Sequence, residues 1–242
     1  FRFWPAETKA GTETGAAASA PAGPRDRAAR PERERLGLPE RYLVYSGRYD
    51  ARQDLATLLR ALELMGAAGR PAGLRAEATW PPRVLLVGTS PGDRASLARA
   101  AGRLDLGESL AYAPHLPDER LATLVRGARA AILPALSDAT GLPALEAIAC
   151  GTPVVASAVG ALPEVVGKAG ILVPPREPER LAAALTTIWT EERVHARLAG
   201  AARRRAETDR RTWADVARDT RRIYAEVGVR PPDEAAPDGT RT

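Results

Sequence analysis

The chain has 242 residues, 45% of them hydrophobic and 27% charged, and a formal net charge of +5. The length allows one domain or two, and the apolar share is ordinary for a globular protein. No apolar run reaches the roughly 20 residues that a membrane-spanning helix needs, and we find no secretory signal segment in the first residues. These features argue against a membrane-spanning protein, so we expect a soluble, cytoplasmic one.

The positive charge is carried almost entirely by arginine, since Lys9 and Lys168 are the only lysines. A basic surface suits phosphates, nucleic acids or an anionic membrane, but a composition rich in Ala and Arg also follows from codon bias alone. No zinc-ligand spacing, aromatic-rich strand motif or continuous basic helix indicates a nucleic-acid partner. Peripheral contact with the inner face of the membrane stays open. Cys150, the single cysteine, lies in a helical run, where we interpret it as a buried structural thiol.

The two ends of the chain lack the apolar periods of the middle. Residues 1–35 are mostly Ala, Gly, Pro and charged residues, which bury too little surface to offset the entropy of ordering, so we expect a largely disordered linker. Residues 209–228 predict a terminal helix with Trp213 and Tyr224 among its apolar positions. Residues 229–242 are polar and Pro-rich, which predicts a flexible tail.

Between residues 36 and 208, short apolar runs alternate with amphipathic segments. The runs predict buried strands, and apolar residues that recur every three or four positions predict helices. This alternation predicts an α/β fold with a doubly wound parallel sheet, whose ligand crevice lies at the carboxyl ends of the strands. The predicted strands are 42–46, 83–87, 110–113, 130–133, 154–156 and 170–173. The predicted helices are 55–62, 91–104, 117–126, 143–150, 161–166, 178–189 and 193–207, followed by 212–227 beyond this region.

The segment 132–157, ILPALSDATGLPALEAIACGTPVVAS, carries the functional prediction. It predicts a strand, a loop, a helix that starts near Pro143, and a second strand. The loop and the helix start bring Asp138 and Glu146 to the same end of the strands. Gly141 allows close approach of a ligand, and the free N–H groups of the first helical turn form an anion site. The alternation alone leaves an ordinary βαβ unit open as the alternative.

Residue by residue, this segment resembles the donor-site signature of retaining, nucleotide-sugar-dependent glycosyltransferases of the two-domain GT-B fold, the large family-four type. The resemblance extends over about residues 36–227. The segment departs from the signature at Asp138, Ala139 and Thr140, where the family carries Glu, Gly and Phe. The matching positions are Gly141, Leu142, Pro143, Leu145, Glu146, Ala147, Ala149, Gly151 and 153–157.

The resemblance implies that Gly47 and Arg48, after the first predicted strand, contact the donor diphosphate. Glycine lets the backbone approach a ligand, and arginine offers a forked donor to phosphate oxygens. The family carries a lysine five residues further on, where this chain has Gln53. One cation is therefore missing, and we expect the neighbouring Arg52 to turn in and replace it.

At the helix start, the resemblance implies that backbone N–H groups meet the donor phosphate. Pro143 has no N–H to give, so we expect Leu142 and Ala144 to be the donors. Glu146 would accept hydrogen bonds from the ribose hydroxyls, because a carboxylate accepts two donors at once.

Asp138 matches the first Glu of the signature, which implies contact with sugar hydroxyls and stabilisation of an oxocarbenium-like transition state. Its side chain is shorter by one methylene, or roughly 1.5 Å of reach, and a misplacement of about 1 Å lowers rates on the order of 10²-fold. A loop cap is the alternative role. His115 and Leu116 resemble the loop that cradles the nucleobase, whereas we interpret His195 as a surface residue.

We therefore expect the donor-binding half of a retaining hexosyltransferase that uses a UDP- or GDP-sugar without a metal or a cofactor, with Asp138 and Arg48 as catalytic residues. Residues 1–5 resemble the interdomain connector of the family, which implies an N-terminal acceptor domain on which residues 209–228 pack, and little transfer by this chain alone. Two alternatives stay open. The departures at Asp138 and Gln53 fit a catalytically impaired nucleotide-sugar-binding or interaction module, and sugar-nucleotide epimerases share the fold.

Overall fold

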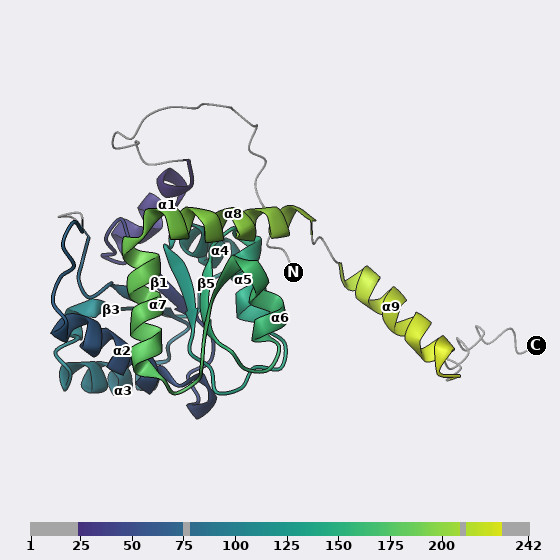
Figure 1. Cartoon of the computed structure of the whole chain (residues 1–242), viewed down its shortest axis with the longest axis horizontal. Helices are drawn as coiled ribbons and strands as arrows, with labels where there is room; N and C mark the ends of the chain where they lie inside the picture. The colour runs from purple at the N-terminus through teal and green to yellow at the C-terminus, as the bar shows by residue number, and fades with distance from the viewer. Residues whose placement is uncertain (1–23, 75–77, 209–211, 229–242) are drawn as a thin grey trace, which may run out of the picture. The chain divides into compact units, whose positions relative to one another are not determined.

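The computed structural model of the chain describes residues 24–74, 78–208 and 212–228 (Figure 1). The chain divides into two compact units, one that ends at Ala206 and one that starts at Glu207. The first unit holds the sheet and the helices that cover it, and the site described below belongs to this unit alone.

Six parallel strands form one sheet in the order β3-β2-β1-β4-β5-β6. The strand order changes direction between β1 and β4, which confirms the predicted doubly wound α/β fold. β1 and β4 pair only through Leu43 with Ala130 and Val44 with Ala131, so their pairing stops before their carboxyl ends. The strands are β1 (Leu43–Ser46), β2 (Val84–Val87), β3 (Leu110–Ala113), β4 (Ala130–Leu133), β5 (Val154–Ser157) and β6 (Gly170–Val173).

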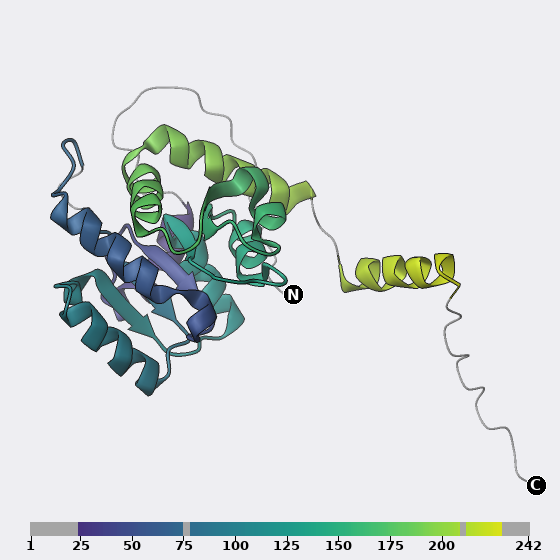
Figure 2. The same cartoon turned by 60° about the horizontal axis from the view of Figure 1, so that its bottom comes forward.

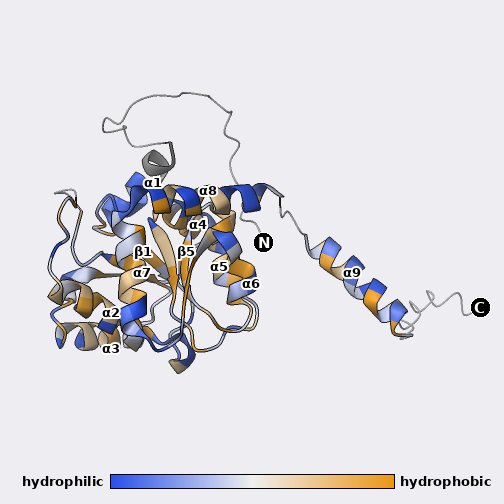
Figure 3. Cartoon of the chain, viewed as in Figure 1, coloured by the Kyte–Doolittle hydropathy of each residue, from blue (hydrophilic) through white to orange (hydrophobic). Residues whose placement is uncertain are grey.

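Helices cover both faces of this sheet (Figure 2). Consecutive strand residues point to opposite faces: Leu43 is buried with Leu62 of α2 and Leu185 of α7, and Val44 is buried with Leu124 of α4. Figure 3 shows apolar colours in the strands β1 and β5 and hydrophilic stretches along the helix α8. The helices of the first unit are α1 (Pro24–Arg35), α2 (Leu55–Ala67), α3 (Pro91–Gly102), α4 (Asp118–Gly127), α5 (Leu142–Ala149), α6 (Leu162–Val166), α7 (Pro178–Thr190) and α8 (Glu192–Thr208), whose last residues pass into the second unit.

Helix α1 corrects the prediction that residues 1–35 form a disordered linker, because α1 packs on α4. Ala29 is fully buried, and a Cβ added to Gly127 would lie 2.6 Å from the Cβ of Ala29. An ion pair between Arg120 and Glu32, with an N–O distance of 2.7 Å, joins the two helices as well. The prediction failed because small residues and ion pairs make this contact, and they leave no apolar period in the sequence.

The second unit contains α9 (Trp213–Glu226), a helix where the sequence predicts one. The hydroxyl of Thr212 caps its start by accepting the N–H of Asp215 at 3.2 Å. Both hydrophobic and hydrophilic colours run along α9 in Figure 3. Among the residues that the structure describes, no helix combines the length and the apolar content that crossing a membrane requires. Residues 1–23 of the predicted linker and the predicted tail lie outside the described residues.

Candidate functional site

The candidate site lies where β1 and β4 stop pairing, at the carboxyl edge of the sheet. One bordering loop follows β1 and leads into the short 3-10 helix η1 (Ala51–Gln53), and the other, residues 134–141, follows β4 and leads into α5. The backbone N–H of Leu136 donates to the carbonyl of Arg52 at 2.6 Å, which joins the two loops. The sheet order thus brings the predicted residues from both halves of the motif to one edge.

A buried phenol supports the loop after β1. Tyr45 is fully buried, and its hydroxyl donates to the backbone carbonyl of Arg48. Burial raises the pKa of Tyr45, so the phenol stays neutral. A Cβ added to Gly47 would lie 2.9 Å from the Tyr45 hydroxyl oxygen. A larger residue at position 47 would therefore have to displace the Tyr45 phenol, a steric reason for glycine that the sequence alone does not reveal.

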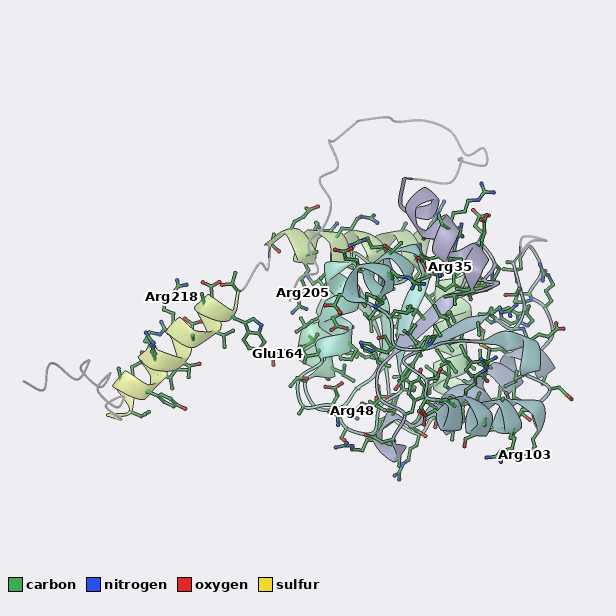
Figure 4. All side chains as sticks on the ribbon, turned by 180° about the vertical axis from the view of Figure 1, so that it is seen from behind. Arg35, Arg48, Arg103, Glu164, Arg205 and Arg218 are labelled. Carbon is green, nitrogen blue, oxygen red and sulfur yellow. The ribbon has the colours of Figure 1, made fainter. Side chains whose placement is uncertain are left out.

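The three polar side chains of this loop that were predicted to bind the donor have different environments. Arg48 is exposed and lies at the edge of the first unit remote from α8 (Figure 4). Arg52 instead forms an ion pair with Asp50, with its Nη2 2.8 Å from Oδ2, and this interaction lowers the pKa of Asp50. The expected turn of Arg52 toward the crevice is therefore absent from this structure. Gln53 is half-buried, with its Oε1 3.5 Å from the Tyr45 hydroxyl.

Asp138 caps the loop after β4. Its Oδ1 accepts the backbone N–H of Thr140 at 3.0 Å and that of Gly141 at 2.6 Å. The structure thus gives Asp138 the capping role that we kept as the alternative to a sugar contact. Among the described residues, its Oδ2 accepts no side-chain or backbone donor, so one carboxylate oxygen is left for a ligand.

Two glycines let this loop pack closely on the segment around α6. Gly141 has a φ of +64°, and an added Cβ would lie 2.8 Å from Cγ2 of Val165. Gly160 has a φ of +52°, and an added Cβ would lie 1.8 Å from the carbonyl oxygen of Asp138. Behind the loop, the side chain of Arg205 donates to the carbonyl of Glu164 at 3.3 Å (Figure 4). The position of Asp138 is therefore fixed by packing as well as by its own hydrogen bonds.

Helix α5 begins directly after this loop, with Gly141 as its N-cap and no side chain capping its first N–H groups. Leu142 is exposed and Ala144 is buried, at the start of a helix that points its positive end at the crevice. Glu146 is half-buried; burial raises the pKa of its carboxyl, and the carboxylate of Asp118 raises it further. Because Asp118 is the first residue of α4, the Glu146 carboxylate lies near the same edge of the sheet.

The loop between β3 and α4 holds the residues predicted to meet a base. His115 is exposed and Leu116 is buried, so only His115 presents its side chain to solvent. A hollow of about 500 Å³ lies beside this loop, between β3 and α3. Its lining includes Tyr112 and Arg94, whose guanidinium carbon lies 5.5 Å from the centre of the tyrosine ring. Among the described residues, no group of His, Cys, Asp or Glu is arranged to hold a metal ion.

An arginine cluster, Arg41 and Arg129, lies at the opposite edge of the sheet, just before β1 and β4. The Nη2 of Arg41 donates to the carbonyl of Trp189 at 2.6 Å, and the Nε of Arg129 donates to that of Ile188 at 2.9 Å. Both guanidinium groups pair with Glu192, at 3.1 and 2.9 Å. The cluster thus ties the end of α7 to the starts of the two central strands.

His195 and Cys150 lie away from the crevice. The interpretation of His195 as a surface residue is wrong: it is half-buried beside the arginine cluster. Burial, followed by the charge of Arg129, lowers its pKa to about 4. Cys150 is 3% exposed, which confirms the buried thiol. Neither residue contributes to the candidate site.

Sequence reasoning missed Tyr45, Asp50 and Asp118 as parts of the site. Tyr45 reads as an ordinary apolar strand residue, and its contact with the following loop depends on where the chain turns after β1. Asp50 stands two residues before Arg52, a spacing that could have indicated the pair in a tight turn. Asp118 in α4 lies near Glu146 in α5, and a single sequence gives no signal for the proximity of two residues on different helices.

Residues 26–205 match the family model described as "Glycosyl transferases group 1". The chain belongs to this family. Its fold is that of the Rossmann-like C-terminal half of a GT-B glycosyltransferase.

Curated relatives of this family member include known transferases. The D-inositol 3-phosphate glycosyltransferase of Streptomyces griseus is 34% identical over 196 residues, which cover 79% of this chain and 41% of that protein. The MMP alpha-(1->4)-mannosyltransferase of Mycolicibacterium hassiacum is 42% identical over 118 residues, which cover 48% of this chain and 28% of that protein. This chain therefore spans well under half the length of both relatives.

Solved structures of the same fold give a consistent result. Sucrose-phosphate synthase from Thermosynechococcus elongatus has a TM-score of 0.64 and 28% identity, covering 81% of this chain and 48% of that one. Anabaena HepE, solved in complex with UDP and glucose, has a TM-score of 0.65 and 21% identity, covering 85% of this chain and 53% of that one. The second likeness, at this identity, concerns the fold alone.

Proposed function

We propose that this chain is the donor-binding half of a retaining glycosyltransferase that takes a UDP- or GDP-activated hexose without a metal ion. One observation carries the proposal. The loop of Arg48, the loop of Asp138 and the start of α5 converge where β1 and β4 stop pairing, and the hydrogen bond from Leu136 to Arg52 joins the two loops. In doubly wound sheets, this change of strand direction is where nucleotides bind.

Each group has a role that follows from its environment. The exposed guanidinium of Arg48 and the N–H groups of Leu142 and Ala144 supply positive charge for the diphosphate, which is also the leaving group. Stabilising the charge that develops on that group lowers the barrier to breaking the glycosidic bond. Burial raises the pKa of the Glu146 carboxyl, which means that its charged form lacks solvation. Two ribose hydroxyls that donate hydrogen bonds to the carboxylate would stabilise that charged form.

Asp138 contacts the sugar through Oδ2, because Oδ1 is held by the loop. The base lies against the β3–α4 loop, where His115 is exposed. An acceptor domain, supplied by the longer protein that the relatives' lengths suggest, completes the site. Transfer by this chain alone is therefore expected to be slight.

A second candidate, a nucleotide-sugar-binding module with impaired catalysis, is favoured by two observations. The carboxylate expected to act on the sugar also caps its own loop, and the charge of Arg52 is neutralised by Asp50. In a full-length protein, absence of transfer or hydrolysis from any donor, with donor binding intact, would favour this module over the enzyme.

Calorimetric titration of the chain with UDP and with GDP tests the donor site. We expect one of them to bind and Glu146→Gln to weaken that binding about 10-fold, since a hydrogen bond to a charged group contributes about 1.5–3 kcal/mol. Glu164→Gln, an exposed carboxylate in the first turn of α6, is the matched control and should bind like wild type. Equal affinities for wild type and Glu146→Gln would refute the ribose assignment.

A further inference from the structure

The phenol of Tyr45 touches both ends of the loop that carries the diphosphate contacts. It is fully buried and belongs to the next-to-last residue of the strand β1. Its hydroxyl donates to the carbonyl of Arg48 and lies 3.5 Å from the Oε1 of Gln53. The Tyr45 side chain thus contacts both Arg48, which offers a cation, and Gln53, five residues further on.

The hydrogen bond from Tyr45 to the Arg48 carbonyl fixes the backbone of Arg48, and therefore the point from which its side chain extends. A residue larger than Gly47 between them would have to displace the phenol, because a Cβ there would lie 2.9 Å from the phenol oxygen. The ring is held in turn by Tyr49, whose ring centre lies 5.4 Å away in an edge contact and whose hydroxyl donates to the carbonyl of Val87 at 2.7 Å. The loop therefore has little freedom to move relative to β1 and β2.

The contact with Gln53 orients an amide. A phenol has one proton, whose nearer acceptor is the Arg48 carbonyl; the Oε1 of Gln53, at 3.5 Å, is a second and weaker acceptor of the same O–H in a three-centre hydrogen bond. With its oxygen turned to the phenol, the amide directs its NH₂ end elsewhere. That NH₂ is a neutral donor of two hydrogen bonds in the same loop as the exposed Arg48.

On this geometry, and resting on the proposed function, we propose that Tyr45 is a positioning residue for the donor diphosphate. It holds Arg48 and Gln53 as a pair, so that the amide N–H groups of Gln53 donate to phosphate oxygens beside the guanidinium. The site then grips the diphosphate with one cation and one neutral donor on the β1 side, and Arg52, paired with Asp50, takes no part.

Tyr42 provides a matched control in the same segment of chain. Its ring is also fully buried, and its hydroxyl donates to a backbone carbonyl, that of Leu124 in α4, at 2.6 Å. It lies at the other end of β1, away from the crevice. Tyr42→Phe and Tyr45→Phe remove the same atom from comparable surroundings, so they separate loss of stability from loss of positioning.

The test compares affinities of the 242-residue chain for UDP and GDP, by calorimetry, with those for uridine and guanosine, by ligand-observed NMR. For the base that binds, we expect Tyr45→Phe to lower the affinity for the nucleoside diphosphate about 5-fold, the effect of losing one neutral hydrogen bond. The affinity for the nucleoside should be unchanged. Tyr42→Phe should leave both affinities unchanged even where it lowers the melting temperature. An unchanged ratio of diphosphate to nucleoside affinity in Tyr45→Phe would overturn the proposal.

A double-mutant cycle tests whether Tyr45 acts through Gln53. Gln53→Met keeps the length and removes the amide, so the double variant should bind the diphosphate no more weakly than the poorer single variant. If the fold-losses in diphosphate affinity of the two single variants multiply in the double variant, Tyr45 does not act through Gln53. If the wild-type chain binds neither UDP nor GDP, the proposed function fails and this inference fails with it. If the wild-type chain binds and Tyr45→Phe leaves the ratio of diphosphate to nucleoside affinity unchanged, only this inference fails.

Discussion

The two loops that border the crevice are held in different ways. The loop after β4 is fixed by one of its own side chains, because the Asp138 carboxylate accepts the N–H groups of Thr140 and Gly141, and the loop also packs against the turn at Gly160. The loop after β1 is fixed by one side chain beneath it, the phenol of Tyr45, which binds the carbonyl of Arg48.

The departures from the glycosyltransferase signature involve the groups that hold each loop. The loop after β4 departs at three positions, and one of them, Asp138, keeps a carboxylate that caps the loop. The loop after β1 departs at Gln53, whose Oε1 lies 3.5 Å from the supporting phenol. Three further substitutions test the comparison.

The largest effect is expected from Gly160→Ala on the β4 side. The added Cβ would lie 1.8 Å from the carbonyl oxygen of Asp138 at a φ of +52°, so we expect the free energy of unfolding to fall by about 3 kcal/mol. Chemical denaturation measures the loss. Gly102→Ala in α3, where an added Cβ meets nothing within 4 Å, is the control and should shift stability by less than about 1 kcal/mol. Equal stabilities of the two variants would contradict the close packing.

A smaller effect is expected from Asp138→Ala, which removes the acceptor for two loop N–H groups. We expect a loss of about 1–2 kcal/mol in the free energy of unfolding. Asp138→Asn keeps an oxygen in the same place and should stay close to wild type in stability, while in a full-length enzyme it lowers turnover more than nucleotide binding. Thermal melts of both variants separate the two roles, and an equal loss in Asn and Ala would rule out the cap.

The smallest effect is expected on the β1 side from Asp50→Asn. The substitution keeps an oxygen for the cap of η1 but releases the charge of Arg52 from its ion pair. Affinity for UDP or GDP should rise about 3-fold at low salt and less at high salt, since an exposed pair is weak and screened. Glu63→Gln, which breaks the exposed pair with Arg60 on α2, is the control. An equal rise in both variants would indicate a general charge effect rather than a contribution of Arg52.

The sheet could be predicted from the sequence because its strands are continuous apolar runs, and each predicted strand overlaps an observed one. The edge where the site residues meet followed from the parallel topology. Helix α1 could not be predicted, since its buried contact rests on Ala29 and Gly127, which carry no apolar signal. The low pKa of His195 depends on its burial and on the charge of Arg129, far away in sequence, and the cap at Asp138 depends on a loop conformation that a motif does not specify.

The arginine cluster has a consequence for α7 as well as for the strands. The last carbonyl groups of a helix have no partner within the helix, and the cluster supplies donors to two of them, those of Ile188 and Trp189. Arg41 and Arg129 therefore act as a C-terminal cap for α7 that comes from the starts of β1 and β4, so truncating either arginine would leave a backbone acceptor of the helix end without that donor.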